Sequence, residues 1–207
     1  MSIAPDKPRL PVYGEPTWEI AQLFPTQGTW SEAEYLALDT NHLVEFSDGF
    51  VEFLPMPTMT HQLIAHLFHC VLESFVLAYG LGTVVGAAFK VRMRDGKYRE
   101  PDVVFMLTQH ASRISNDFWI GADLVMEVVS DGDENRFRDL VTKRDEYAKA
   151  GILEYWIVDP ELGQISVLAL DGTSYAVHGD FKRGEQATSK LLPGFAVDVT
   201  SALAGKR

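Results

Sequence analysis

Two short apolar runs constrain the fold most, because each contains or adjoins a carboxylate. "REPDVVFML", residues 99–107, places Asp102 at the start of a run of Val, Phe, Met and Leu. "ADLVMEVVS", residues 122–130, places Glu127 inside a similar run. A charge within a buried strand is costly unless it is paired or holds a metal ion. The runs therefore predict two buried strands, and their carboxylates suggest one shared site.

The segments around these runs predict mixed α and β structure. Residues 61–79 carry apolar side chains at spacings of three and four, which indicates an amphipathic helix that Gly80 ends. "HLVEFSDGFVEFLP" predicts a hairpin that turns at residues 47–49, and residues 83–93 alternate as one strand. The remaining expected elements are a helix over about 137–150, a buried strand over 153–160, and strands near 164–170, 173–178 and 195–199. This order predicts an α/β domain around one central sheet.

Length and composition predict one cytoplasmic domain. The chain has 207 residues, and residues 1–28 hold five prolines, so we expect an extended N-terminal arm followed by a single domain over 29–207. Cys70 is the only cysteine, which excludes an intrachain disulfide and fits a reducing compartment. The N-terminus does not resemble a signal peptide, and no apolar run approaches the roughly 20 residues of a membrane span. We therefore expect a cytoplasmic protein without a membrane partner.

Asp102 and Glu127 are candidate ligands of one divalent cation. They lie 25 residues apart, which leaves room for two neighbouring strands and a connection. If those strands pair, two carboxylates with a backbone carbonyl and waters suit Mg²⁺ or Mn²⁺. Such an ion can activate water and neutralise a phosphoryl transition state. The structural alternative is that Asp102 caps a strand end and Glu127 pairs with an arginine.

A third candidate, Lys143, lies in "RDLVTKRDEYAKAG". Asp139, Lys143 and Tyr147 are spaced by four and so share one face of a helix. Gly151 then turns the chain directly into a buried strand, so this helix can aim Lys143 back at the strand ends. A lysine there can orient a water or stabilise charge on a phosphate. The alternative is an ordinary surface pair between Asp139 and Lys143.

Several of these segments together resemble a known family. They are "EFSDGFVEFLP", "PDVVFM", "LVMEVVSDGDENRFRDLVTKRDEYAKAGILEYWIVDP" and "LPGFAVDV". They are similar to the Uma-two family of endonucleases, within the PD-(D/E)XK or restriction-endonuclease-like superfamily, from about Thr29 to Val199. The resemblance implies a restriction-endonuclease-like core, with a central mixed sheet flanked by helices and extra β-hairpins.

The resemblance also implies an activity and a site. It implies hydrolysis of a DNA phosphodiester to leave a 5′-phosphate, with Asp102 and Glu127 as ligands of Mg²⁺ or Mn²⁺ and Glu45 as a further acidic residue. The superfamily expects a lysine two residues after the glutamate, where this chain has Val129. Lys143 matches the place from which this family draws its lysine. A homodimer is expected by analogy with superfamily members that cut two strands.

One basic segment could contact DNA. "KVRMRDGKYRE" directly precedes Asp102, and its cations could bind phosphates; they are Lys90, Arg92, Arg94, Lys97 and Arg99. The alternative is a solvated strand face. The net charge of −11 opposes nucleic-acid binding on average. Together with Val129, this acidity favours a second hypothesis, namely a catalytically degenerate nuclease fold that serves as a binding or assembly module.

Overall fold

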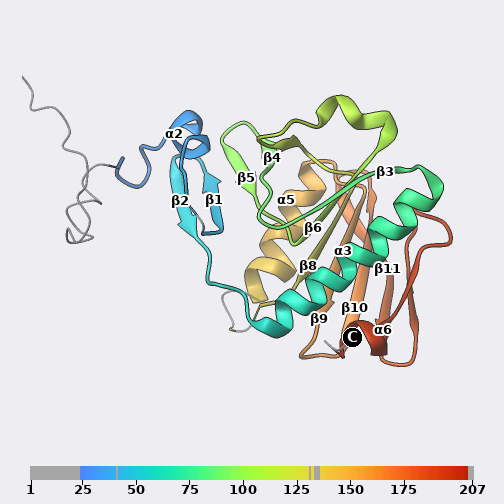
Figure 1. The fold of residues 1–207 in the computed structure, drawn as a ribbon. Coiled ribbons are helices and arrows are strands. Elements are labelled where there is room, and N and C mark those ends of the chain that lie inside the picture. The colour runs from blue at the N-terminus through green and yellow to red at the C-terminus, as the bar shows by residue number, and fades with distance from the viewer. Residues whose placement is uncertain (1–23, 41, 131, 133–135, 205–207) are drawn as a thin grey trace, which may run out of the picture.

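The fold is built from two main sheets, and the chain passes between them more than once (Figure 1). The computed structural model describes residues 24–40, 42–130, 132 and 136–204. Most of the arm expected over residues 1–28 therefore lies outside the described residues. The predicted mixed α/β architecture is confirmed, with a small third sheet near the C-terminus.

The larger sheet has six strands in the order β11-β10-β9-β8-β6-β3. β8 and β9 run parallel, and the other neighbouring strands are antiparallel. In chain order these strands are β3 (Gly82–Gly86), β6 (Val103–Leu107), β8 (Leu124–Val128), β9 (Glu154–Asp159), β10 (Gln164–Asp171) and β11 (Ser174–Lys182). β8 and β9 are buried along their whole length, because both faces of the sheet are covered.

The long helix α3 (Met59–Tyr79) packs on one face of this sheet (Figure 1). Thr58 caps its first turn, and Gly80 ends it in the left-handed conformation with a φ of 62°. Its buried residues recur every four positions and join the core with β6, β8 and β9; they are Ile64, Phe68, Leu72 and Val76. The sequence pattern placed this helix within two residues of its observed start.

The length of α3 corrects one expectation. Within the described residues, α3 is the single helix whose length and composition would allow it to cross a membrane. The sequence contains few charges between Met59 and Tyr79, which is why the expectation that no apolar run approaches this length was wrong. One face of the helix is packed into the core, as in the central helix of a globular fold.

A second helical segment covers the opposite face of the main sheet. It begins with a stretch of π-helix, η2 (Arg138–Thr142), and continues as α5 (Lys143–Lys149). Tyr147 and Ala148 pack with residues of β6, β8 and β9 that face away from α3. Gly151 then reverses the chain into β9 with a φ of 77°. The helix expected over 137–150 therefore exists, with a different first turn.

The second sheet has five strands in the order β2-β1-β5-β4-β7. Their bounds are β1 (Val44–Ser47), β2 (Phe50–Phe53), β4 (Val91–Arg94), β5 (Lys97–Arg99) and β7 (Trp119–Ile120). The β1–β2 hairpin is confirmed, but its turn is only Asp48 and Gly49, both with positive φ, and Ser47 pairs within the strand. The short helix α2 (Glu32–Leu36) begins at Ser31 with a complete capping box.

Residues 83–93 do not form one strand, so that expectation was wrong. β3 ends at Gly86 and pairs with β6, whereas β4 begins at Val91 and pairs with β5 and β7 in the other sheet. Alternation continues through both strands, and periodicity alone does not reveal a change of sheet. The connecting segment 87–90 passes close to the start of β6, where Ala87 N donates to Asp102 O.

Two further segments complete the fold. The link between β6 and β8 contains the 3-10 helix η1 (Thr108–Arg113). β12 (Gln186–Thr188), which the sequence pattern missed, pairs with β13 (Ala196–Asp198), and α6 (Val199–Ala202) follows. This tail packs against the α3 side of the main sheet and completes its core.

Candidate active site

The pairing of β6 with β8 brings the two predicted carboxylates together. Val103 lies opposite Met126 in this antiparallel ladder, so Asp102, one residue earlier, lies opposite Glu127 on the same face. Val128 N donates to Asp102 Oδ2 over 2.8 Å, which fixes the aspartate to the neighbouring strand. The predicted convergence of the two strands is therefore present.

Lys143 reaches Glu127 from the first turn of α5. Its Nζ lies 2.9 Å from Glu127 Oε1, and both side chains are about 95% buried. Tyr147, one turn later, donates its hydroxyl to the same carboxylate oxygen over 2.5 Å. The spacing of four residues thus places two donors of one helix face on one acceptor. Lys143 therefore contacts one of the two predicted carboxylates, Glu127, and its catalytic role stays a prediction.

Asp139 is a member of this cluster that sequence reasoning did not assign to the site. Its Oδ1 lies 3.2 Å from Lys143 Nζ, and the side chain is buried. Burial excludes the surface-pair alternative for Asp139 and Lys143. The i,i+4 spacing was visible in the sequence, but the depth of the pair depends on how η2 packs against the sheet.

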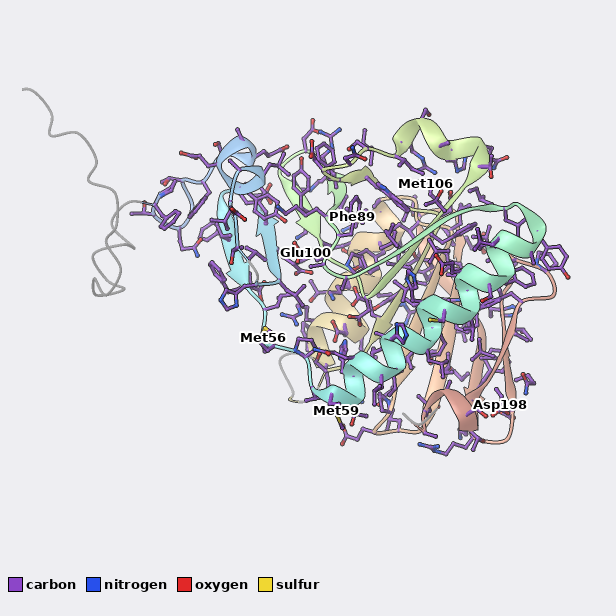
Figure 2. The ribbon with its side chains drawn as sticks, viewed as in Figure 1. Met56, Met59, Phe89, Glu100, Met106 and Asp198 are labelled. Atoms are coloured by element: carbon purple, nitrogen blue, oxygen red, sulfur yellow. The ribbon has the colours of Figure 1, made fainter. Side chains whose placement is uncertain are left out.

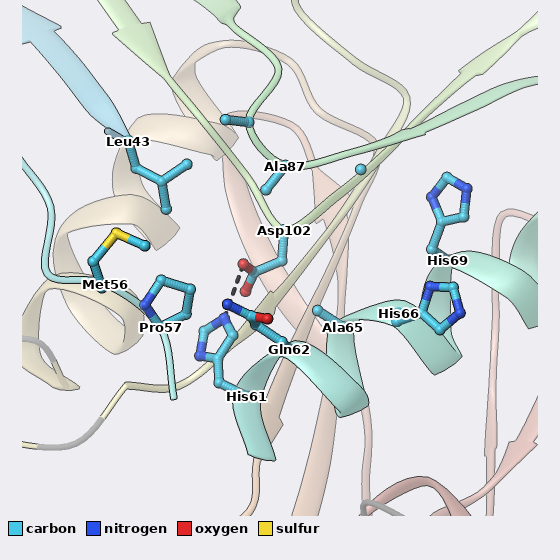
Figure 3. Close-up of a pocket in the computed structure, with 12 residues that line it drawn as sticks. Leu43, Met56, Pro57, His61, Gln62, Ala65, His66, His69, Ala87 and Asp102 are labelled. Carbon is cyan, nitrogen blue, oxygen red and sulfur yellow. Dashed lines mark hydrogen bonds and ion pairs between the residues drawn. The ribbon is translucent and has the colours of Figure 1, made fainter. Parts of the chain in front are cut away.

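His61 is the second residue that spacing could not assign. It lies in the first turn of α3, and its Nε2 lies 2.9 Å from Asp102 Oδ1 (Figure 3). Burial acts to lower the pKa of His61, but the hydrogen bond to Asp102 and the surrounding carboxylates outweigh it and raise the pKa above 6.5. The contact spans 41 residues of sequence, so no local pattern could have revealed it.

The cluster lines a small pocket that carries excess negative charge. Asp102, Glu127 and Lys143 all border it, and its volume of about 40 Å³ holds a few water molecules. The acidic lining residues are Glu100, Asp102, Glu127 and Asp139, and the basic ones are Arg138 and Lys143, which gives a formal charge of −2. Figure 2 shows Glu100 between the β1–β2 hairpin and the main sheet.

The pKa of Glu127 reflects this charge excess. Burial raises it to about 7, and the charges of Asp102 and Asp139 add to that rise, although Lys143 and Tyr147 oppose it. The pKa of Lys143 is raised despite burial, because Glu127 and Asp139 stabilise the ammonium. The site therefore holds a charged lysine among more carboxylates than it can neutralise.

The donor set fits a divalent cation that keeps part of its water shell. Among the residues that the structure describes, no three His, Cys, Asp or Glu side chains are arranged to enclose a metal ion. Two hard carboxylate ligands, Asp102 and Glu127, with the rest supplied by water, suit Mg²⁺ or Mn²⁺ better than a closed metal site. A charge of +2 would also balance the formal charge of the lining.

Glu45 lies near the cluster but outside the residues that line the pocket. It is buried on β1 and forms an ion pair with Arg99, which also binds Glu146 of α5. These contacts tie the five-stranded sheet to the helix that carries Lys143. The structure thus gives Glu45 a structural partner, and its catalytic role stays a prediction.

The basic segment before Asp102 is mostly neutralised by carboxylates. Val91 and Met93 face inward while Arg92 and Arg94 face outward, as alternation predicted. Four of the segment's five cations form ion pairs with carboxylates, and the fifth lies over an aromatic ring. The ion pairs are Arg92–Asp95, Arg94–Asp48, Lys97–Glu146, Arg99–Glu45 and Arg99–Glu146, and Lys90 lies 4.9 Å from the centre of the Tyr35 ring. DNA contact by this segment stays a prediction.

Comparison with known proteins finds a matching family and a solved structure with a similar fold. A family model described as "Uma2: Putative restriction endonuclease" matches residues 3–200. One similar solved structure is titled a putative nuclease belonging to DUF820 from Anabaena variabilis ATCC 29413. It shares 17% identity with a TM-score of 0.69, over 85% of this chain and 98% of that chain. No curated protein matches.

Proposed function

We propose that this chain, which belongs to the Uma2 family of restriction-endonuclease-like proteins, is a metal-dependent DNA endonuclease. The observation that carries the proposal is the meeting of Asp102, Glu127 and Lys143 around one acidic pocket. The family match and the nuclease-like fold support a nuclease independently of that geometry. The metal, the DNA substrate and the residue roles belong to the proposal.

The proposed chemistry assigns one task to each side chain. Asp102 and Glu127 would hold Mg²⁺ or Mn²⁺, which supplies Lewis-acid polarisation of a phosphate and a more acidic bound water. Lys143 stays protonated because its pKa is raised, so it stabilises charge that develops on the phosphate rather than accepting a proton. His61 holds Asp102 in position through its hydrogen bond.

Cleavage of supercoiled plasmid by the pure full chain tests this proposal. We expect nicked and linear DNA with MnCl₂ or MgCl₂ and none with EDTA, and 5′-phosphate ends on the products. Asp102→Asn and Glu127→Gln should each lower the rate by at least about 100-fold, as losses of central catalytic groups do. Glu73→Gln on α3 is the matched control, because Glu73 is half-exposed and does not line the pocket.

Equal cleavage by the control and by both site variants would identify a contaminating nuclease and remove the basis of the proposal. A second candidate function is a degenerate nuclease fold that binds without turnover. Val129 at the superfamily lysine position and the net charge of −11 favour it. DNA binding by the intact chain without cleavage in either metal would support that candidate over the endonuclease.

A further inference from the structure

A second, larger hollow adjoins the acidic pocket. It lies between α3 and the segment 86–88, with a volume of about 560 Å³, and we call it the α3 groove (Figure 3). His61 and Asp102 line both the α3 groove and the acidic pocket. A group bound in the groove would therefore lie directly beside the proposed metal ligands. Its volume falls within the range of small-ligand sites.

The chemistry of the groove differs from that of the acidic pocket. Its apolar contacts come from Met56, Ala65 and Ala88, and its polar ones from imidazole and amide groups such as His66 and Gln62. No lysine or arginine is among the described residues that line it. This combination suits a flat, uncharged group that can both stack and form hydrogen bonds. Nucleobases have that chemistry, and they stack on imidazole rings.

An additional polar atom lies in the groove wall. The Nδ1 atom of His69 is buried and has no hydrogen-bond partner within the described part of the chain. It faces Gly86, where a Cβ atom would lie 3.4 Å away. Glycine at position 86 lets the backbone of segment 86–88 pack closely against this ring. The nitrogen therefore lies behind the surface of the groove and forms part of its wall.

The surrounding charges favour an unpaired nucleotide over a duplex. A protein that follows duplex DNA needs a row of cations to replace the counterions of the phosphates. Here the arginines and Lys97 of the basic segment before Asp102 are paired with carboxylates. Within a duplex, a base also cannot enter a groove without leaving its stack. Single strands depend more on stacking, which this groove can offer.

We propose that the α3 groove binds an unpaired nucleobase next to the scissile phosphate, so that the substrate class is single-stranded or locally unpaired nucleic acid. This inference rests on the proposed nuclease function and adds a strand preference to it. His66 and Gln62 are the recognition residues, because both are exposed in the groove and neither belongs to the metal cluster.

Fluorescence anisotropy with labelled dT12 and with the dT12·dA12 duplex tests the proposal on the full chain. CaCl₂ replaces Mg²⁺, and a gel verifies that the oligonucleotides stay intact. We expect dT12 to bind at least about tenfold more tightly than the duplex. One stacking contact between a base and an aromatic ring contributes about that factor to affinity, and a paired base cannot form it. His66→Ala and Gln62→Ala should weaken dT12 binding, and His66→Tyr should retain it. The exposed His178 on β11 provides the control variant His178→Ala.

Two results would overturn the strand preference. One is duplex binding as tight as dT12 binding, and the other is unchanged dT12 affinity in both His66→Ala and Gln62→Ala. If plasmid cleavage still required Asp102, the nuclease function would stand while this inference failed. If dT12 binding depended on the groove residues but no cleavage occurred, the groove would bind single strands as proposed, and the proposed endonuclease activity would fail.

Discussion

Lys143 Nζ lies 2.9 Å from Glu127 Oε1, and the two side chains are enclosed between α5 and the main sheet. Asp139 adds a second carboxylate 3.2 Å from the same nitrogen. A buried ion pair of this kind is costly to break, because the remaining charge keeps its desolvation penalty without a partner. The pair therefore affects folding as well as the proposed chemistry.

Removal of the lysine charge should destabilise the protein strongly. We expect Lys143→Met to lower the free energy of unfolding by about 3–5 kcal/mol, because Glu127 and Asp139 would remain buried without their cation. The double variant Lys143→Met/Glu127→Gln should recover part of that loss. Urea unfolding followed by circular dichroism measures both values.

Lys149→Met on the same helix is the matched control. Lys149 lies 2.7 Å from Asp145, but both side chains are exposed, so the change should cost under about 1 kcal/mol. Additive effects in the Lys143 and Glu127 double variant would contradict the coupling that the structure predicts.

Glu154 should anchor the C-terminal segment. It is fully buried at the start of β9, and its carboxylate accepts four hydrogen bonds. The donors are Trp156 Nε1, Ser189 Oγ, Lys190 N and Leu191 N, at 2.6 to 2.8 Å. Glu154→Ala should cost about 3 kcal/mol or more, because each buried donor without a partner costs about 1–3 kcal/mol.

Hydrogen exchange distinguishes this anchoring from a general loss of stability. Relative to the wild type, Glu154→Ala should raise the exchange rates of the Lys190 and Leu191 amides more than those of amides in the β10–β11 hairpin. Glu185→Ala is the control, since Glu185 is exposed and accepts from Lys182 N in the same region. Unchanged protection of Lys190 and Leu191 in Glu154→Ala would show that the segment is held by other contacts.

The sequence predicted turns and helix ends, because the residues that form them are neighbours in the chain. The hairpin turn near Asp48 and Gly49 and the left-handed Gly80 at the end of α3 are each decided within a few residues. The break between β3 and β4 escaped the same reasoning, because alternation says which residues face inward but not against which sheet they pack.

The candidate site shows the same division between local and non-local information. Asp102 and Glu127 were predictable because the first directly precedes an apolar strand and the second interrupts one. The helix face of Lys143 follows from spacing alone. The pairing of His61 with Asp102 and of Arg99 with Glu45 joins segments 41 and 54 residues apart. The first pair depends on how α3 packs against the main sheet, and the second on the pairing of β1 with β5. No sequence periodicity encodes either contact.

Acid should weaken the contact between α5 and the five-stranded sheet. Burial acts to raise the pKa of Glu146, but its hydrogen bonds and ion pairs with Arg99 and Lys97 outweigh burial and lower the pKa below 4.5. The unfolded chain therefore binds this proton more readily than the folded chain. The stabilisation is complete above pH 4.5 and is lost as the pH falls through the lower folded-state pKa.

The free energy of unfolding between pH 6 and pH 3 measures this effect. Glu146→Gln should be less stable than the wild type at pH 6 and should lose less stability as the pH falls. Asp171→Asn, at the exposed turn between β10 and β11, controls for the removal of one acidic group. A pH dependence in Glu146→Gln as steep as in the wild type would exclude Glu146 as its source.

Binding of a divalent cation should stabilise the folded chain through Asp102 and Glu127. A ligand at 100 times its Kd adds about 2.7 kcal/mol, which corresponds to a rise in Tm of roughly 5–10 °C for a domain of this size. We expect MnCl₂ to produce this rise in differential scanning fluorimetry and EDTA to reverse it. Asp102→Asn and Glu127→Gln should each abolish the Mn²⁺-dependent rise in Tm, whatever the Tm of the metal-free variant. Asp171→Asn should keep that rise. An equal rise in both site variants would mean that the cation binds elsewhere, and the acidic pocket would then lose its proposed role as the metal site.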